Sequence, residues 1–161
     1  PEVYLYPSEY VQTEYIDKGR ITKEESCNLR YGFEFGKGWL KLADELGELA
    51  TEFVKLLKLS GMQEDAYIKS CIIKEKFSTL AIQGDNNLKD IYRDMWYKIK
   101  SSIERKSSII CEITGKNGVS CFRGGWLKTL CKEEAIKDGY TPSSKSYQKY
   151  WNLYPPEKIS E

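Results

Sequence analysis

The fold is decided by one long amphipathic stretch, which reads Trp39-Leu-Lys-Leu-Ala-Asp-Glu-Leu-Gly-Glu-Leu-Ala-Thr-Glu-Phe-Val-Lys-Leu-Leu57. Its apolar residues recur at steps of three and four, so they share one face of an α-helix. They are Trp39, Leu42, Ala43, Leu46, Leu49, Ala50, Phe53, Leu56 and Leu57. Gly36 and Gly38 indicate a turn before this segment. Gly61 suits the end of a helix, so the sequence predicts a helix from about Trp39 to Gly61.

A second apolar stripe predicts another long helix over about residues 88 to 106. The stripe is made of Leu88, Ile91, Tyr92, Met95, Trp96, Ile99 and Ile103. Much of the remaining surface of this helix is basic, through Lys89, Arg93, Lys98, Lys100, Arg105 and Lys106. Asn86 or Asn87 is expected to cap it.

The segments around the second helix have the composition of strands. Residues 66–73 and 78–83 predict two strands separated by Lys74-Glu-Lys-Phe77, and Gly84-Asp-Asn-Asn87 predicts a turn. Further on, Gly115-Lys-Asn-Gly118 predicts the turn of a β-hairpin over residues 107–125. A short helix is then expected to open at Gly124-Gly125-Trp126 and to close at Gly139. Trp39 and Trp126 are both expected to be core residues.

Together these elements predict one α+β domain. It contains two main helices, an antiparallel hairpin and a C-terminal part that looks like a degenerate zinc ribbon. The length of 161 residues is usual for one domain. We expect an irregular N-terminal arm over residues 1–30, with a short strand near Val3. A core follows over 31–140, including the ribbon-like 107–137, and an aromatic tail occupies 141–161.

The composition argues against most enzyme classes. The chain has no histidine, so it lacks the commonest general base and the commonest metal ligand. It has neither a phosphate-binding loop nor a dinucleotide-binding fingerprint. Its carboxylates, such as Glu34, Glu45 and Asp85, are scattered without pairing. We therefore expect a protein that is not an enzyme and that uses no cofactor.

Charge and cysteine content indicate the compartment. The net charge of +1 gives no overall field for nucleic acid. No apolar stretch is long enough to span a membrane, and the first residues do not read as a signal peptide. The five cysteines are odd in number and scattered, which favours reduced thiols. We expect a cytoplasmic protein with no membrane partner.

Two cysteine motifs have the spacing of zinc-ribbon ligand pairs. They are Cys111-Glu-Ile-Thr114 and Cys131-Lys-Glu-Glu134. Thr114 and Glu134 stand where a tetrahedral zinc site would need a thiolate or an imidazole. We therefore expect no metal, with Cys111 and Cys131 buried as small apolar residues. The alternatives are a disulfide between two of Cys111, Cys121 and Cys131, or a metal site with Cys121 as third thiolate.

Taken jointly, several motifs over residues 31–140 carry a family resemblance. They are Gly36-Lys-Gly38-Trp39, Lys74-Glu-Lys-Phe77, Cys111-Glu with Gly115 and Gly118, and Gly125-Trp126-Leu-Lys-Thr-Leu-Cys131. The set resembles an uncharacterised family of small phage and prophage proteins. That family combines a G-W-x-x-L helix, a K-E-K-F-G hairpin and a terminal C-E-x-C … G-W-x-x-T-x-C-x-x-H ribbon. This chain departs from the pattern at Ser78, Thr114 and Glu134. The resemblance implies a mobile-element setting and no particular activity.

The candidate binding residues form two groups. Lys74, Glu75 and Lys76 are a charged cluster that the resemblance singles out, although lysines also protect hairpin edges in general. Arg123 adds a cation near the ribbon. Tyr147, Tyr150, Trp151 and Tyr154 are spaced to share one helical face, and exposed aromatic residues of this kind commonly anchor partners.

The resemblance, the aromatic content of 13% and the missing catalytic groups favour a binding function. We expect a non-enzymatic phage or mobile-element protein that binds and inhibits a host protein in the host cytoplasm. The most concrete version is an anti-CRISPR-like inhibitor of a CRISPR effector or of another defence protein. The alternative is a nucleic-acid-binding accessory protein that uses the basic second helix and the ribbon, with Phe122 and Trp126 stacking on bases.

Overall fold

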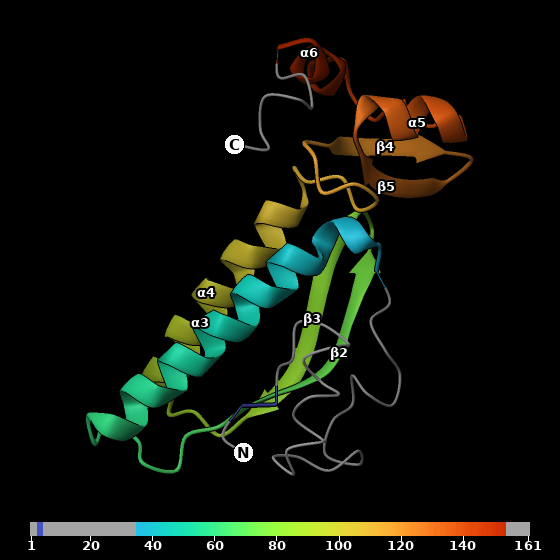
Figure 1. Ribbon diagram of the computed structural model, residues 1–161. Helices are drawn as coiled ribbons and strands as arrows, with labels where there is room; N and C mark the ends of the chain where they lie inside the picture. Colours follow the sequence, from blue (N-terminus) through green and yellow to red (C-terminus); the bar gives the residue numbers. More distant parts are fainter. Residues whose placement is uncertain (1–2, 5–34, 154–161) are drawn as a thin grey trace.

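A computed structural model describes residues 3–4 and 35–153 of the protein (Figure 1). The expected N-terminal arm therefore lies outside the described residues, except for its short strand β1 (Val3–Tyr4), which is confirmed. Tyr154 and the residues after it also lie outside. The expected α+β class is confirmed, since the described chain combines helices with two small sheets whose main strand pairs are antiparallel hairpins.

The first part of the fold is a helix pair on a small sheet. A 3-10 turn, η1 (Lys37–Trp39), leads into α3 (Leu40–Leu59), and α4 (Asp90–Ser107) lies beside it. The sheet has the order β1-β2-β3, where β2 (Ile68–Lys76) runs parallel to β1 and antiparallel to β3 (Thr79–Asn86). Figure 1 shows both helices along one side of this sheet. Both long helices are confirmed close to their expected positions.

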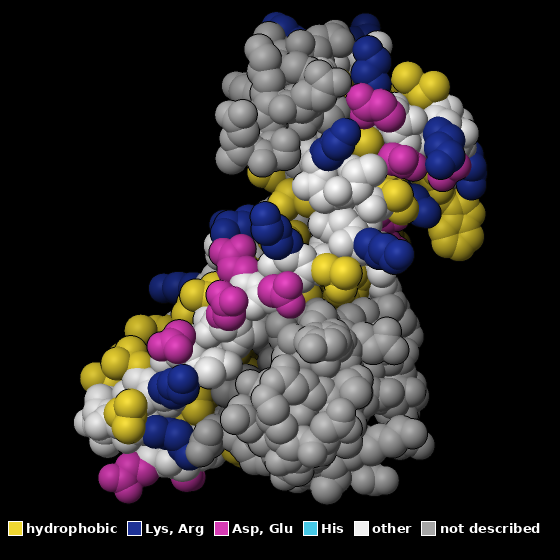
Figure 2. Space-filling model, in the orientation of Figure 1, with side chains coloured by type: hydrophobic (Ala, Val, Ile, Leu, Met, Phe, Trp, Pro, Cys, Tyr) yellow, Lys and Arg dark blue, Asp and Glu magenta, His cyan; other side chains and the backbone are white. Residues whose placement is uncertain are grey.

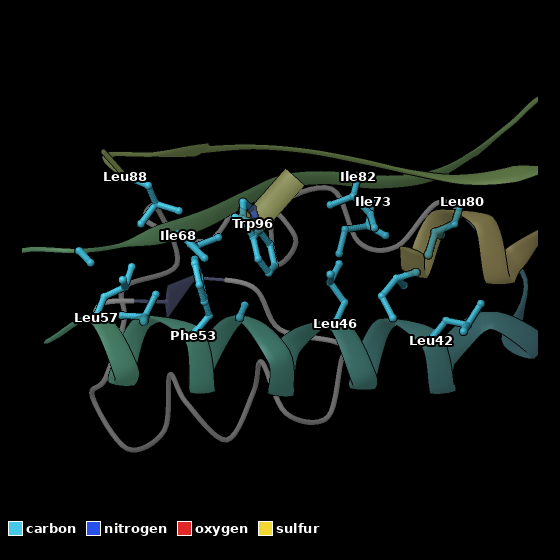
Figure 3. Close-up of a cluster of buried hydrophobic side chains, with 14 of the residues drawn as sticks. Leu42, Leu46, Phe53, Leu57, Ile68, Ile73, Leu80, Ile82, Leu88 and Trp96 are labelled. Carbon is cyan, nitrogen blue, oxygen red and sulfur yellow. The ribbon is translucent and has the colours of Figure 1, made fainter. Parts of the chain in front are cut away.

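The core of this part lies between the helix pair and the sheet (Figure 3). The apolar face of α3 contributes Leu42, Leu46, Phe53 and Leu57, and η1 contributes Trp39. The strands contribute Ile68, Ile73, Leu80 and Ile82. Phe53 stacks on Trp96 of α4, with ring centres 6.4 Å apart. No helix in the described ranges combines the length and the apolar character needed to cross a bilayer.

The second part is a C-terminal unit at one end of the helix pair (Figure 1). Its sheet has the order β5-β4-β6, formed by β4 (Val119–Arg123), β5 (Trp126–Leu130) and β6 (Thr141–Pro142). Two helices, α5 (Lys132–Asp138) and α6 (Lys145–Leu153), complete it. Gly139 ends α5 in the left-handed region at φ 71°, as its position predicted. A separate small core holds Cys111, Val119, Cys121, Leu130, Cys131, Ala135, Tyr140 and Trp151.

The expected boundaries of the central hairpin were wrong. Strand β2 continues through Lys76, so Lys74-Glu-Lys lies within the strand and the turn is Phe77-Ser78. Strand β3 continues through Asn86, where residues 84–87 were expected to turn. Backbone pairing of Lys69 with Asp85 and of Ile68 with Asn86 accounts for the extension. Ladder hydrogen bonds therefore overrode the local preference of glycine and asparagine for a turn.

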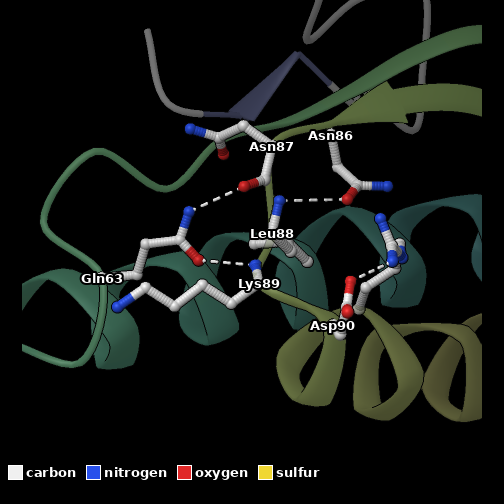
Figure 4. A network of polar contacts seen from close by, with 7 residues as sticks. Gln63, Asn86, Asn87, Leu88, Lys89 and Asp90 are labelled. Atoms are coloured by element: carbon white, nitrogen blue, oxygen red, sulfur yellow. Dashed lines mark hydrogen bonds and ion pairs between the residues drawn. The ribbon is translucent and has the colours of Figure 1, made fainter.

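The asparagines fix the approach to α4 instead of capping it (Figure 4). The side chain of Asn86 accepts a hydrogen bond from the Leu88 N–H at 3.1 Å. Gln63 bridges the same segment, because its amide donates to the Asn87 carbonyl and its oxygen accepts from the Lys89 N–H. Lys89 is the N-cap residue and has no side-chain cap bond.

The C-terminal hairpin also differs from expectation. Its turn is Gly124-Gly125, with φ values of 51° and 87°, and Trp126 belongs to strand β5. The side chain of Trp126 is 72% exposed, so it is not a core residue, whereas Trp39 is fully buried as expected. Gly118 was expected in a turn, but a Cβ there would lie 2.8 Å from the Cys111 nitrogen. Close packing of the loop, rather than chain reversal, explains that glycine.

Two glycines let the C-terminal unit sit directly on the start of α3. The Gly38 N–H donates to the Glu112 carbonyl at 2.8 Å, and the Trp39 indole donates to the Ile110 carbonyl at 2.8 Å. A Cβ at Gly36 would lie 2.2 Å from the Glu112 oxygen, and one at Gly38 would lie 2.1 Å from the Cys111 oxygen. Backbone therefore packs on backbone here, and no larger residue fits.

We predict that Gly38→Ala lowers the free energy of unfolding by about 3 kcal/mol, because the added methyl group forces two backbone segments apart. Gly61→Ala is the matched control: its φ of 74° is unfavourable for alanine, but a Cβ there meets nothing within 4 Å. It should lower the stability by only about 1 kcal/mol. Urea denaturation followed by tryptophan fluorescence measures both. Equal losses in the two variants would contradict the packing argument.

Candidate functional site

The turn between β2 and β3 holds two non-glycine residues in the left-handed region. Phe77 has φ 51° and Ser78 has φ 65°. This conformation suits glycine or asparagine in a two-residue hairpin turn, and it is unfavourable for a bulky side chain. The Phe77 side chain is 73% exposed, so burial does not compensate for the backbone strain. Residues under such strain concentrate at functional sites.

The C-terminal unit holds this turn in place. The Ser78 N–H donates to the Glu75 carboxylate at 2.7 Å. The Thr129 hydroxyl donates to the Ser78 carbonyl, and the Ser78 and Ser120 hydroxyls are 3.3 Å apart. Ser78 and Thr129 are both buried. The turn is therefore anchored by strands β4 and β5, while the Phe77 ring is left in solvent.

The same face of the β4–β5 hairpin carries further exposed apolar side chains. Ser120 pairs with Thr129, and Phe122 pairs with Leu127. Because side chains alternate between the faces of a strand, these two pairs lie on one face. The inner pair contacts the Ser78 turn, and the outer pair, Phe122 and Leu127, is exposed.

Trp126 pairs with Arg123 at the end of the hairpin, so its side chain is on the opposite face from Phe122 and Leu127. We call the four apolar residues that the two hairpins expose, Phe77, Phe122, Trp126 and Leu127, the hairpin surface. Figure 2 shows hydrophobic side chains protruding from the C-terminal unit with basic side chains beside them. Exposed aromatic rings that lie on an anchored strand pair are well suited to bind a partner.

The cations near this surface are held by aromatic rings. The Lys76 ammonium lies 5.9 Å from the centre of the Phe77 ring. The Arg123 guanidinium lies 4.6 Å from the centre of the Tyr140 ring and also donates to the Asp138 carbonyl. Cation–π contacts of this kind restrict the side chain without neutralising its charge.

The structure separates the residues that the sequence grouped as binding candidates. Lys76 and Arg123 lie close to residues of the hairpin surface in the chain, whereas Lys74 is half-buried within β2. Glu75 holds the Ser78 turn, so its role is structural. In the tail, Tyr147 is partly exposed but Trp151 is buried in the C-terminal core, which corrects the expectation of partner contacts through Trp151. The Tyr150 side chain and Tyr154 lie outside the described residues.

Sequence reasoning missed Glu112, a buried carboxylate between the two parts of the fold. Its side chain is only 4% exposed, and one oxygen lies 3.4 Å from the Lys128 ammonium. Within the described chain the other oxygen has no hydrogen-bond partner. Burial raises the pKa of this carboxyl, Glu75 raises it further, and Lys128 opposes both. The sequence signal for this buried carboxylate was its position directly after Cys111 and shortly before Gly115 and Gly118.

The three cysteines of the ribbon-like part are fully buried free thiols, which confirms the expectation of small buried residues. The Thr114 hydroxyl donates to the Cys131 sulfur at 3.7 Å, in place of a second ligand. Burial raises the pKa of Cys121 to about 12 and that of Cys131 to about 11. Among the described residues, no group of cysteines and carboxylates is placed to hold a metal ion.

Comparison with protein families, with curated proteins and with solved structures gives no match for this chain. The phage-protein resemblance therefore rests on the sequence motifs alone. Function has to be argued from the chemistry of the site, and the site that the described residues offer is the hairpin surface.

We predict that Glu112→Gln stabilises the protein at neutral pH. Because the pKa of Glu112 is raised by folding, ionisation destabilises the folded state above that pKa, and the effect is absent below the ordinary value of 4.5. The variant should gain about 1 kcal/mol at pH 8, and this gain should shrink as the pH falls toward 4.5.

Urea denaturation at several pH values measures this gain. Glu52→Gln is the control, because the Glu52 side chain is 74% exposed and its substitution should change little at any pH. A Glu112→Gln protein that is less stable than the wild type at pH 8 would show that the ion pair with Lys128 outweighs the burial of the charge.

We also predict that the buried thiols are unreactive in the folded protein. At pH 8 the raised pKa values keep Cys121 and Cys131 protonated, and burial blocks access to all three sulfurs. Iodoacetamide should label less than roughly one tenth of Cys111, Cys121 and Cys131 before unfolding, and all of them afterwards. Peptide mapping by mass spectrometry separates these sites from Cys27 and Cys71. Rapid labelling of any of the three in the native state would contradict the burial.

Proposed function

We propose that the protein is a non-enzymatic binding protein that acts by covering part of a partner protein with its hairpin surface. The observation that carries this proposal is the strained and exposed Phe77. Its backbone conformation costs about 1 to 2 kcal/mol for a residue with a side chain of this kind. Glycine or asparagine would form the same turn with less strain. Folding therefore does not explain a phenylalanine at position 77, whereas burial of its ring in a partner protein does.

The surroundings of Phe77 fit a protein interface. Phe122 and Leu127 add apolar area on the face of the hairpin that contacts the Ser78 turn, and Trp126 is exposed at the end of that hairpin beside Arg123. Aromatic residues and arginine are enriched among energetically dominant interface residues. The anchored turn reduces the entropy lost on binding, because the ring is already presented on fixed backbone. The cations around it supply a polar rim.

The biological setting of the proposal comes from the sequence. The resemblance to small phage proteins supports a mobile-element protein that blocks a host protein in the host cytoplasm. An anti-CRISPR-like inhibitor of a CRISPR effector, or of another defence protein, is its most concrete form. The absence of histidine from the chain also supports a role without catalysis.

A second candidate function is binding of single-stranded nucleic acid. It is favoured by the exposed rings of Phe122 and Trp126 beside Arg123 and Lys128, because bases stack on such rings between cations. One observation places it second: Lys128 is paired with the Glu112 carboxylate, so its charge is compensated within the fold.

We predict that Phe77→Asn separates stability from binding. Asparagine tolerates the left-handed conformation, so the free energy of unfolding should rise by about 1 kcal/mol. Loss of the ring should weaken partner binding by roughly tenfold or more, the loss typical of an interface anchor. Trp126→Ala should weaken binding similarly without a stability gain. Ile136→Gln, at an exposed apolar position on α5, should change neither property.

Binding is measured in two stages. Immobilised wild type and the three variants first capture proteins from bacterial lysate. A protein retained by wild type and Ile136→Gln but lost from both other variants is then purified for affinity measurement. Equal capture by all four proteins would overturn the proposed surface. Gel shifts with single-stranded DNA and RNA at low and high salt decide the second candidate, since nucleic-acid affinity falls steeply with salt.

A further inference from the structure

Two exposed rings of the hairpin surface each have an exposed cation beside them. Trp126 lies directly opposite Arg123 in the register of β4 and β5, so the two side chains share one face of the hairpin. Phe77 follows Lys76, whose ammonium lies 5.9 Å from the centre of the ring. All four residues are exposed. A partner that covers either ring therefore also covers the cation next to it.

The charges of these two cations are not compensated within the described part of the chain. Among the described residues, no carboxylate lies within 4.0 Å of the Lys76 ammonium or of the Arg123 guanidinium. Glu75, the neighbour of Lys76, accepts a hydrogen bond from the N–H of the following turn instead. Asp138 meets Arg123 through its backbone carbonyl, which carries no net charge.

Arg123 is the better placed of the two cations to bind an anion. Its guanidinium lies 4.6 Å from the centre of the Tyr140 ring, and one terminal nitrogen donates to the Asp138 carbonyl. A guanidinium carries five N–H donors, so several remain after this bond, and a carboxylate can accept two of them side by side. Because the side chain is already restrained, it loses less entropy when an anion binds.

The position of the cations determines what a partner must provide. Covering a ring removes water from the cation beside it, and a buried charge without a counter-charge is strongly unfavourable. We infer that the hairpin surface binds an acidic protein surface, in which Asp or Glu side chains border the apolar area that receives the rings. Arg123 binds one carboxylate beside Trp126, and Lys76 binds another beside Phe77. This inference rests on the proposed function and adds the chemistry of the partner.

The charge of the C-terminal unit as a whole agrees with an acidic partner. Residues 111–153 contain seven lysines and arginines and four aspartates and glutamates, a net charge of +3, whereas the whole chain has +1. Figure 2 shows basic side chains spread over this unit. A field of this sign attracts an acidic surface before contact and speeds association.

A single-stranded nucleic acid matches these cations less well. Its backbone carries one phosphate per nucleotide, so it is bound by a groove in which cations follow one another. Lys128, the next cation on the face that carries Arg123, is paired with Glu112. Helix α5, whose last residue meets Arg123, has Glu133 and Glu134 in its first turn. Isolated cations of this kind fit the single carboxylates of a protein surface.

Fluorescence anisotropy with a labelled decaglutamate peptide tests the inference on the full chain. We expect saturable binding at low ionic strength that is lost at high salt. Arg123→Gln and Lys76→Gln should each weaken binding by roughly threefold, the effect of losing one exposed ion pair. Glutamine removes the charge of Arg123 but keeps an N–H donor for the Asp138 carbonyl. In NMR titrations the indole N–H signal of Trp126 should shift, while that of the buried Trp39 should not.

Arg105→Gln and Lys98→Gln are the matched controls, because both residues are exposed on α4 of the helix pair. Neither should change the affinity for decaglutamate. Equal losses in the controls and in the test variants would reveal attraction to net charge alone and overturn the inference. A wild-type protein that does not bind the peptide would overturn it as well. Tighter binding of labelled oligothymidylate, weakened by Arg123→Gln and Lys76→Gln, would assign the surface to nucleic acid instead.

This titration and the lysate capture can fail separately. If Phe77→Asn loses a captured protein but decaglutamate does not bind, the hairpin surface stands and its acidic partner is wrong. If decaglutamate binds through Arg123 but Phe77→Asn captures the same proteins as wild type, the anion site stands and the proposed anchor is wrong.

Discussion

The whole arrangement depends on a close approach of two backbones at the start of α3. Gly36 and Gly38 lie against the carbonyls of Cys111 and Glu112, and the Trp39 indole completes the contact by bonding Ile110. This contact fixes where the C-terminal unit sits on the helix pair. The Ser78 turn can meet Ser120 and Thr129 only because of that placement. The exposed ring of Phe77 is thus positioned by this contact and by the hydrogen bonds of its neighbour Ser78.

The junction between the helix pair and the C-terminal unit contains two residues that are unfavourable for stability. Glu112 is a buried carboxylate with one ion-pair partner, and Phe77 is a large residue in a left-handed turn. Neither is the best choice for stability alone. Both lie where the two parts of the fold meet, so the packing that joins those parts also maintains them. A surface that binds through preorganised rings requires this rigidity.

The sequence predicted the structure well wherever a single hydrophobic periodicity extended over many residues. The face of α3, from Leu42 to Leu57, and the position of α4 followed directly from three- and four-residue spacing. Local turn preferences failed where long-range pairing or packing decided the structure, as at Gly84 in β3 and at Gly118 against Cys111. The site was largely hidden for the same reason, because contacts such as Thr129 with Ser78 join residues far apart in the chain.

The distance along the chain between the partners at the junction also shapes how the protein assembles during synthesis. Trp39 and Ile110 are separated by 71 positions, whereas the β2–β3 hairpin forms from contacts between strands that follow one another directly. Closing the longer loop carries a larger entropic penalty, so it should follow them. On the ribosome, α3 emerges long before the segment that covers its first turn. Until that segment is made, the Trp39 indole has only water as its hydrogen-bond partner, and its ring adds to the apolar surface that the nascent chain exposes.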